Sequence, residues 1–199
     1  MATTRSTART TWVAIRLAVL STVVLGVAYP LAVTGVGQLA FPHQASGSMV
    51  SSGGSVVGSS LIGQSFTGRS AARWFQSRPS AAGEHGYDAA ASSGSNLGPS
   101  NPELRKAIEE RRAAVAAADG VPASSVPVDA VTASGSGLDP DISPAYALLQ
   151  VDRVAAARGL SDAAVRSLVD EHTQGRQLGF LGEPRVNVLE LNLALAGAR

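Results

Sequence analysis

The chain has 199 residues, of which 45% are hydrophobic, with a formal net charge of +1 and no cysteine. A near-neutral balance argues against a nucleic-acid-binding protein, which would carry a basic patch. Without disulfides, the folded part must rely on its own hydrophobic core.

Residues 17–41 form the most apolar segment and contain no charged side chain over 25 positions. As a helix this segment would rise about 37 Å, and the hydrocarbon core of a bilayer is about 30 Å thick. Pro30 removes one backbone hydrogen bond and predicts a kink. We therefore predict a transmembrane helix over residues 12–41, with Trp12 at the membrane interface.

The arginines around this segment predict its orientation. Arg5, Arg9 and Arg16 precede it or lie at its start, and no Lys or Arg follows it until Arg69. The positive-inside rule then places residues 1–11 in the cytoplasm and residues 42–199 outside the plasma (inner) membrane.

A cleaved signal peptide is the alternative, with Gly26-Val27-Ala28 as a small-x-small cleavage site. The apolar stretch continues well beyond this site, which favours an anchor. In both cases the rest of the chain is exported.

The exported part, residues 42–199, is long enough for one domain with a real core. It holds 13 of the 16 basic residues and all 15 acidic residues, so it is slightly acidic. Residues 46–60 are rich in Gly and Ser and predict a linker. Residues 61–66 predict a short strand, with Trp74 and Phe75 as its apolar companions.

Further along, residues 81–98 predict a long surface loop, because Gly, Ser and Ala dominate there. Asn101-Pro102 predicts the start of a helix that ends at Asp119-Gly120. Residues 126–132 carry three valines and predict a strand.

Two more helices are predicted at residues 143–159 and 161–175, with Ser143 and Ser161 at their starts. The tail after Pro184 is either a helix or a strand leading into one. The fold class is therefore α+β: one N-terminal transmembrane helix followed by a single mixed α/β extracytoplasmic domain with long Gly/Ser-rich loops.

Candidate chemistry is sparse. His43, His85 and His172 show no ligand spacing and favour structural or capping roles. Asp139 and Asp141 follow a Gly-rich stretch, which suits a cation-binding loop. A turn leading into the helix at residue 143, where acidic charge complements the helix N-terminus, is the favoured interpretation. With no phosphate-binding loop and no nucleophile motif, nothing points to an independent enzyme.

Longer blocks of sequence resemble one known family. Residues 172–192 are similar to the signature of the KdpC family, the small subunit of the bacterial Kdp potassium-transporting P-type ATPase. Four shorter blocks agree with it, in order along the chain: residues 29–35, 75–80, 93–99 and 132–144.

This resemblance implies a non-catalytic subunit of an ATP-driven potassium uptake complex. The implied partners are a channel-like potassium-translocating subunit, a P-type ATPase subunit and a very small membrane peptide. Potassium is the implied transported ion, and no intrinsic cofactor is expected. The family's small subunit is described both as a catalytic chaperone that raises the ATPase subunit's affinity for ATP and as an assembly element.

The chaperone role raises a difficulty of topology, because ATP is cytoplasmic and the predicted domain lies outside. The family's proposed nucleotide-binding glutamine resembles Gln150 by position, with ATP held through a ternary complex with the ATPase subunit. Gln150 and Arg153 share one face of the predicted helix, and a solvated face explains both without ATP.

Two further hypotheses concern the complex. The domain caps the outer mouth of the channel-like subunit, where Asp139 and Asp141 bias cation entry. The spanning helix packs against that subunit through small residues four apart, Ala14 with Ala18 and Ala28 with Ala32. A stand-alone exported binding module, anchored or released at the membrane, is the alternative function.

Overall fold

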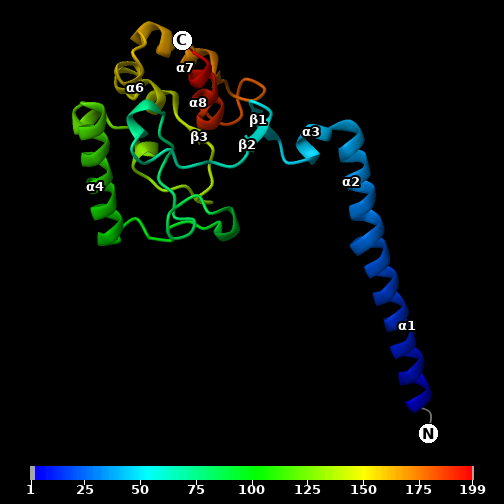
Figure 1. Cartoon of the computed structure of the whole chain (residues 1–199). Helices are drawn as coiled ribbons and strands as arrows, with labels where there is room; N and C mark the ends of the chain where they lie inside the picture. The colour runs from blue at the N-terminus through cyan, green and yellow to red at the C-terminus, as the bar shows by residue number, and fades with distance from the viewer. Residues whose placement is uncertain (1–2, 199) are drawn as a thin grey trace. The chain divides into compact units, whose positions relative to one another are not determined.

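The computed structural model describes residues 3–198 and divides the chain into two compact units, residues 1–49 and 50–199. Figure 1 shows both. The first unit is helical, and the second is a mixed α/β domain.

The first unit is dominated by one continuous helical stretch. It consists of α1 (Thr3–Val23), the π-helical turn η1 (Val24–Ala28) and α2 (Tyr29–Ala40), followed by the short helix α3 (Pro42–Ala45). Residues 7–40 are long and apolar enough to cross a membrane, and none of that surface is buried within the protein. This agrees with the predicted spanning helix in length and composition.

Pro30 explains the π-helical turn. Proline has no backbone N–H, and its ring collides with the carbonyl four residues earlier in a regular α-helix. The Tyr29 N–H donates to the Val24 carbonyl, five residues back, so the turn before Pro30 is wider. The chain thus accommodates the proline without ending the helix.

The second unit begins with a hairpin of β1 (Met49–Ser52) and β2 (Ser55–Ser59). The predicted linker at residues 46–60 is therefore wrong in part. Gly53 and Gly54 both have positive φ, at 58° and 82°, which is the backbone of a tight two-residue hairpin turn. The Gly and Ser content of this segment suits a linker as well as a hairpin turn, so composition alone did not distinguish the two.

Two predicted strands do not form. Residues 61–66 are irregular, although the Gly63 N–H donates to the Leu138 carbonyl. Residues 126–132 contain a 3-10 turn, η5 (Val128–Ala130), which follows η4 (Ala123–Ser125). Pro122 and Pro127 cannot donate to a strand ladder, and Val128 is exposed, so the valines do not alternate between two faces.

The main helices follow local signals. Helix α4 (Pro102–Asp119) starts at Asn101, whose Oδ1 accepts from the Glu103 N–H at 2.8 Å, and ends at Gly120 with φ 66°. The predicted helix over residues 143–159 is two helices, α5 (Pro144–Leu149) and α6 (Val151–Arg158), divided at Gln150. The pair of helices starts after Ser143 and ends before Gly159, as predicted.

Helix α7 (Asp162–Glu171) starts after Ser161 as expected, but it ends before residue 175. After α7 the chain enters β4 (Thr173–Gln174), which pairs with β5 (Arg185–Asn187). The tail continues as α8 (Val188–Gly197), so a strand leading into a helix is confirmed. Strand β3 (Asp141–Ile142) pairs with the other edge of β5, giving an antiparallel sheet of order β3-β5-β4.

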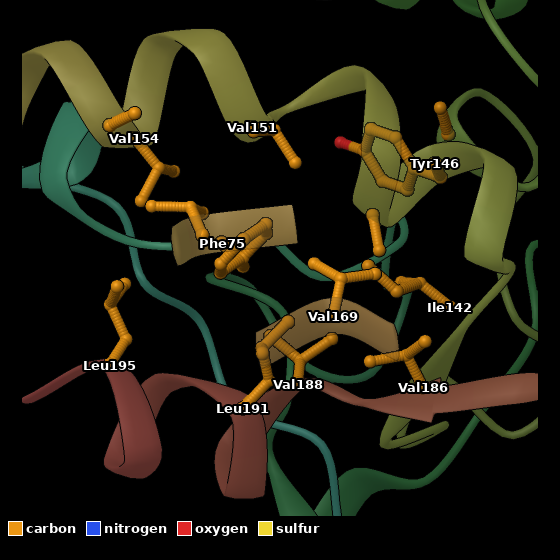
Figure 2. Packing of buried hydrophobic residues seen from close by; sticks show 14 of the residues in the cluster. Phe75, Ile142, Tyr146, Val151, Val154, Val169, Val186, Val188, Leu191 and Leu195 are labelled. Carbon is orange, nitrogen blue, oxygen red and sulfur yellow. The ribbon is translucent and has the colours of Figure 1, made fainter. Parts of the chain in front are cut away.

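Phe75 lies at the centre of the core, between α6 and α8 (Figure 2). The core cluster to which it belongs is built mostly of valines and leucines from β5 and helices α6–α8: Val151, Val154, Val165, Val169, Val186, Leu191 and Leu195. Asn192 holds the Phe75 backbone on both sides, since its Oδ1 accepts from the Phe75 N–H at 2.9 Å and its Nδ2 donates to the Phe75 carbonyl at 3.0 Å. The irregular segment before α4 is thereby fixed to the last helix.

Candidate functional site

Gln150 is fully buried where α5 meets α6, and all of its side-chain hydrogen-bonding positions are filled. Its Oε1 accepts from the Gln76 N–H at 2.6 Å and from Arg153 Nη2 at 2.7 Å. Its Nε2 donates to the carbonyls of Gln76 at 3.2 Å and Tyr146 at 3.3 Å. The expected solvated face is therefore wrong for Gln150. The helix packs this face against residues 71–76, which sequence periodicity does not reveal.

Arg153 extends the same network to α4. Its Nε donates to Asp119 Oδ1 at 2.6 Å, and only 11% and 4% of the two side chains are exposed. Its Nη1 donates to the carbonyls of residues 71, 72 and 74 at 3.2, 2.9 and 3.0 Å. Burial raises the pKa of the Asp119 carboxyl, and the Arg153 guanidinium opposes that rise. One arginine thus joins α4, α6 and the segment before Phe75.

A pocket of about 650 Å³ opens between α4 and residues 65–87. Its size is that of small-molecule sites in general. Arg78, Arg111 and Arg153 line it together with Tyr87 and Tyr146. Arg111 Nη1 donates to the Val131 carbonyl at 3.1 Å, which ties α4 to the turn after η5.

Neither Asp139 nor Asp141 lines this pocket, although Asp139 is paired with Arg78, which does. Asp139 Oδ2 accepts from Arg78 Nη1 at 2.7 Å, and Asp141 Oδ2 lies 3.0 Å from Arg185 Nε. Burial raises the pKa of the Asp141 carboxyl, and the Arg185 charge opposes that rise. Asp139 Oδ1 also accepts from the Asp141 N–H at 3.1 Å, as in a turn.

The residue that caps the following helix, Ser143, is itself held by Asp129. Asp129 accepts from the Ser143 N–H at 2.7 Å and from the Ser143 hydroxyl at 2.9 Å. Ser143 Oγ in turn accepts from the Tyr146 N–H at 3.0 Å. The turn at Asp139 therefore leads through β3 into a capped helix. This agrees with the favoured interpretation of Asp139 and Asp141 as part of a turn.

Sequence reasoning missed the partners of these carboxylates. Arg78 and Tyr87 belong to a loop in which the Tyr87 hydroxyl donates to the Arg78 carbonyl, and burial raises the pKa of Tyr87 to about 12. Ser80 Oγ joins this loop to residues 134–138 by donating to the Gly137 carbonyl at 2.6 Å. No sequence signal marks the contacts of this loop with residues 134–139, because the partners are more than 50 positions apart.

The histidines make no common site. His172 ends α7, where its Nδ1 lies 2.8 Å from the Leu168 carbonyl. His85 lines the pocket wall, and His43 lies in α3. Among residues 3–198, no group of three or more His, Asp or Glu side chains is arranged to hold a metal ion.

Comparison with known proteins decides the family. The model of the family described as "K+-transporting ATPase, c chain" (KdpC) matches residues 11–197. The chain belongs to the KdpC family. The match covers the apolar helix from residue 11 onward, the Gln150–Arg153 network, and Asp139 and Asp141 with their partners.

Individual relatives agree over nearly the whole chain. The potassium-transporting ATPase KdpC subunit of Kineococcus radiotolerans is 62% identical over 182 residues, which cover 92% of this chain and 90% of that protein. The subunit from Sorangium cellulosum is 60% identical over 174 residues, 87% and 90% of the two chains. That of Mycobacterium tuberculosis is 56% identical over 183 residues, 92% and 95%.

Proposed function

We propose that this chain is the accessory KdpC-type subunit of an ATP-driven potassium uptake complex in the plasma membrane. It assembles with, and stabilises, a channel-like potassium-translocating subunit, a P-type ATPase subunit and a small membrane peptide. The family match over residues 11–197 is the observation that carries this proposal.

The apolar helix supports the membrane location. Residues 7–40 rise about 51 Å as a helix, more than the roughly 30 Å of a hydrocarbon core. The arginines at its N-terminal end favour a cytoplasmic N-terminus and an extracytoplasmic second unit. Two pairs of small residues four apart, Ala14 with Ala18 and Ala28 with Ala32, would permit close packing on another spanning helix.

The proposed role does not require this chain to catalyse a reaction. The polar groups that line the pocket mainly hold the fold together: Arg153 binds backbone carbonyls and the buried Gln150 beside it, and Arg78 is paired with Asp139. A subunit built in this way would act through the surfaces that it presents to its partners.

An effect on ATP affinity would then be indirect. Gln150 would have to give up protein hydrogen bonds before it could bind a nucleotide, and the N-terminal arginines favour a location of its domain on the side of the membrane opposite to ATP. We propose that such an effect passes from the second unit to the ATPase subunit through the assembled complex.

The second unit would cap the outer mouth of the channel-like subunit, with Asp139 and Asp141 near the path of entering cations. Each carboxylate is paired with an arginine, which weakens its pull on a cation. Replacing both by Asn should therefore change the apparent potassium affinity of the assembled complex only a few-fold. Uptake kinetics identical to the wild type would remove cation entry from the proposal and leave the structural role.

Assembly itself is tested by affinity purification in detergent. Three chains are compared with the complete one in cells that express the partner subunits: one lacking residues 42–199, one lacking residues 1–41, and one with Ala28 and Ala32 replaced by Leu. We expect the first to co-purify less of the partners and the second to lose membrane association. The third should also co-purify less of the partners, because leucines at positions 28 and 32 prevent close helix packing. Failure of the complete chain to co-purify any partner would contradict the proposal.

The same preparation distinguishes the stand-alone exported module. A mature chain that starts near Tyr29, found outside the membrane fraction, would support that alternative. A chain with its N-terminus intact in the membrane fraction would support the anchored subunit.

A further inference from the structure

The connection between β4 and β5 carries an apolar tip that the rest of the second unit does not cover. Residues 174–184 are all exposed. At the tip, Leu178 is 82% exposed and Phe180 is 69% exposed, and Leu181 beside them is also exposed. Large apolar side chains grouped on a projecting loop are a mark of an interaction surface.

The backbone of this tip is well defined. The N–H groups of Phe180 and Leu181 donate to the Gln177 carbonyl at 3.2 and 2.9 Å, and the Gln177 N–H donates to the Leu181 carbonyl at 2.9 Å. We call residues 177–181 the apolar turn. Its hydrogen bonds close it into a small hairpin, so the two apolar side chains project from a fixed base.

Leu178 has a backbone conformation that is unfavourable for leucine. Its φ is 52° and that of Gly179 is 81°, both in the left-handed region. Consecutive positive φ angles match a tight hairpin turn, in which Asn, Asp or Gly is preferred at the first position. A leucine there is strained, and its exposed side chain gains nothing from burial within the unit.

We infer that the apolar turn is a preformed plug that inserts into an apolar pocket on a partner subunit of the same transport complex. This inference rests on the proposed function. The folded unit bears both backbone strain and an exposed leucine at one position, and burial of Leu178 and Phe180 in a partner would offset both. A turn that is already rigid also loses little conformational entropy on binding.

The charges around the turn favour a protein partner over a lipid surface. Arg176 Nη2 lies 2.6 Å from Glu183 Oε2, and Arg185 is paired with Asp141. The base of the turn is thus electrically balanced and offers no excess positive charge to anionic headgroups. Two or three apolar side chains without such attraction bind a bilayer only weakly.

Substitution of the turn gives the first test. Leu178→Asn suits the left-handed backbone and removes the apolar side chain, and Phe180→Ser removes the second anchor. Val128→Thr is the matched control, since Val128 is an exposed valine on a different surface turn. We expect each turn variant to weaken binding to the partner subunits about tenfold or more, with the thermal midpoint of Leu178→Asn unchanged or raised.

Outcomes of this test separate the two proposals. If the complete chain and both variants co-purify their partners equally, the apolar turn has no role in docking and the proposed function stands. If the complete chain itself brings down no partner, both proposals fail. A thermal midpoint lowered by Leu178→Asn, in parallel with lost binding, would point to a structural role and overturn the inference.

The absence of cysteine allows a second test with a single label. Leu178→Cys, coupled to a polarity-sensitive fluorophore, is placed in lipid nanodiscs alone and then in the assembled complex, with Val128→Cys as control. We expect a blue shift of the label at position 178 only in the complex. A shift in nanodiscs alone would assign the turn to lipid, and a shift that depends on chain concentration would assign it to a second copy; either result overturns the inference.

Discussion

Arg153 and Asp119 form the most buried ion pair among the residues that the structure describes, with Nε and Oδ1 2.6 Å apart. The two residues are 34 positions apart, on α6 and at the end of α4. Through Arg153 the same contact reaches Gln150 and the carbonyls before Phe75. The pair therefore holds one wall of the pocket to the core.

Removal of one partner should leave a buried charge without compensation. We predict that Asp119→Ala lowers the free energy of unfolding by about 3 kcal/mol, measured by denaturant titration of the full chain in detergent. Asp152→Ala is the control, because its pair with Arg166 is largely exposed and should contribute less than about 1 kcal/mol. Equal effects of the two substitutions would contradict the role given to burial.

Gln150→Leu keeps the side chain's size but removes its hydrogen bonds. The Gln76 backbone and Arg153 would lose their partners in a buried place, so we predict a loss of about 2–4 kcal/mol in unfolding free energy. Gln174→Leu, on an exposed strand position, should change it by less than about 0.5 kcal/mol.

The same variant distinguishes structure from nucleotide contact. In the assembled complex, Gln150→Leu should change ATP affinity only as far as it reduces the amount of intact complex. A large loss of ATP affinity in complexes that are otherwise intact would instead support direct contact of Gln150 with the nucleotide.

Gly137 is expected to tolerate no side chain. Its φ is 69°, and a Cβ there would lie 2.6 Å from the Ser93 carbonyl oxygen and 2.7 Å from Ala82 Cβ. Gly137→Ala should destabilise the second unit by at least about 2 kcal/mol, which a lower denaturation midpoint would show. Gly135→Ala is the matched control, because a Cβ at Gly135 would meet no atom within 4 Å.

Alkaline pH should destabilise the second unit through its buried tyrosines. Burial raises the pKa of Tyr87 to about 12 and also raises that of Tyr146, so the folded state holds these protons more tightly than the unfolded chain. Their contribution is complete below about pH 10, the ordinary tyrosine value, and is lost as the pH rises through 12.

Tyr87→Phe tests that assignment. At pH 7 it should cost about 1 kcal/mol, because the Tyr87 hydroxyl donates to the Arg78 carbonyl. Between pH 10 and 12 the advantage of the wild type over the variant should shrink and be lost, as followed by unfolding titrations at each pH. Parallel curves over this range would contradict the raised pKa of Tyr87.

Sequence reasoning was most successful where the signal is local. The side chains of Asn101, Ser143 and Ser161 accept hydrogen bonds from backbone N–H groups two or three residues ahead, and each begins a helix as predicted. Such a cap depends on a few neighbouring residues and needs no knowledge of the fold. The long apolar helix was predictable for the same reason.

The errors arose where pairing partners lie far apart. Residues 126–132 have the composition of a strand but contain Pro127 and lack a neighbouring strand, whereas the short strand β4 forms because β5 lies beside it. Composition alone gave no means of telling these two segments apart.

By itself, the sequence determined an apolar helix with arginines at one end, an α+β second unit and the resemblance to one family. These properties depend on periodicity, local capping and continuous blocks of residues. Only the tertiary structure decided that Gln150 is buried, that Arg78 and Arg185 hold Asp139 and Asp141, and that Leu178 stands exposed on a strained turn. Burial and ion pairing depend on which distant segments meet, and no local pattern in the chain encodes that meeting.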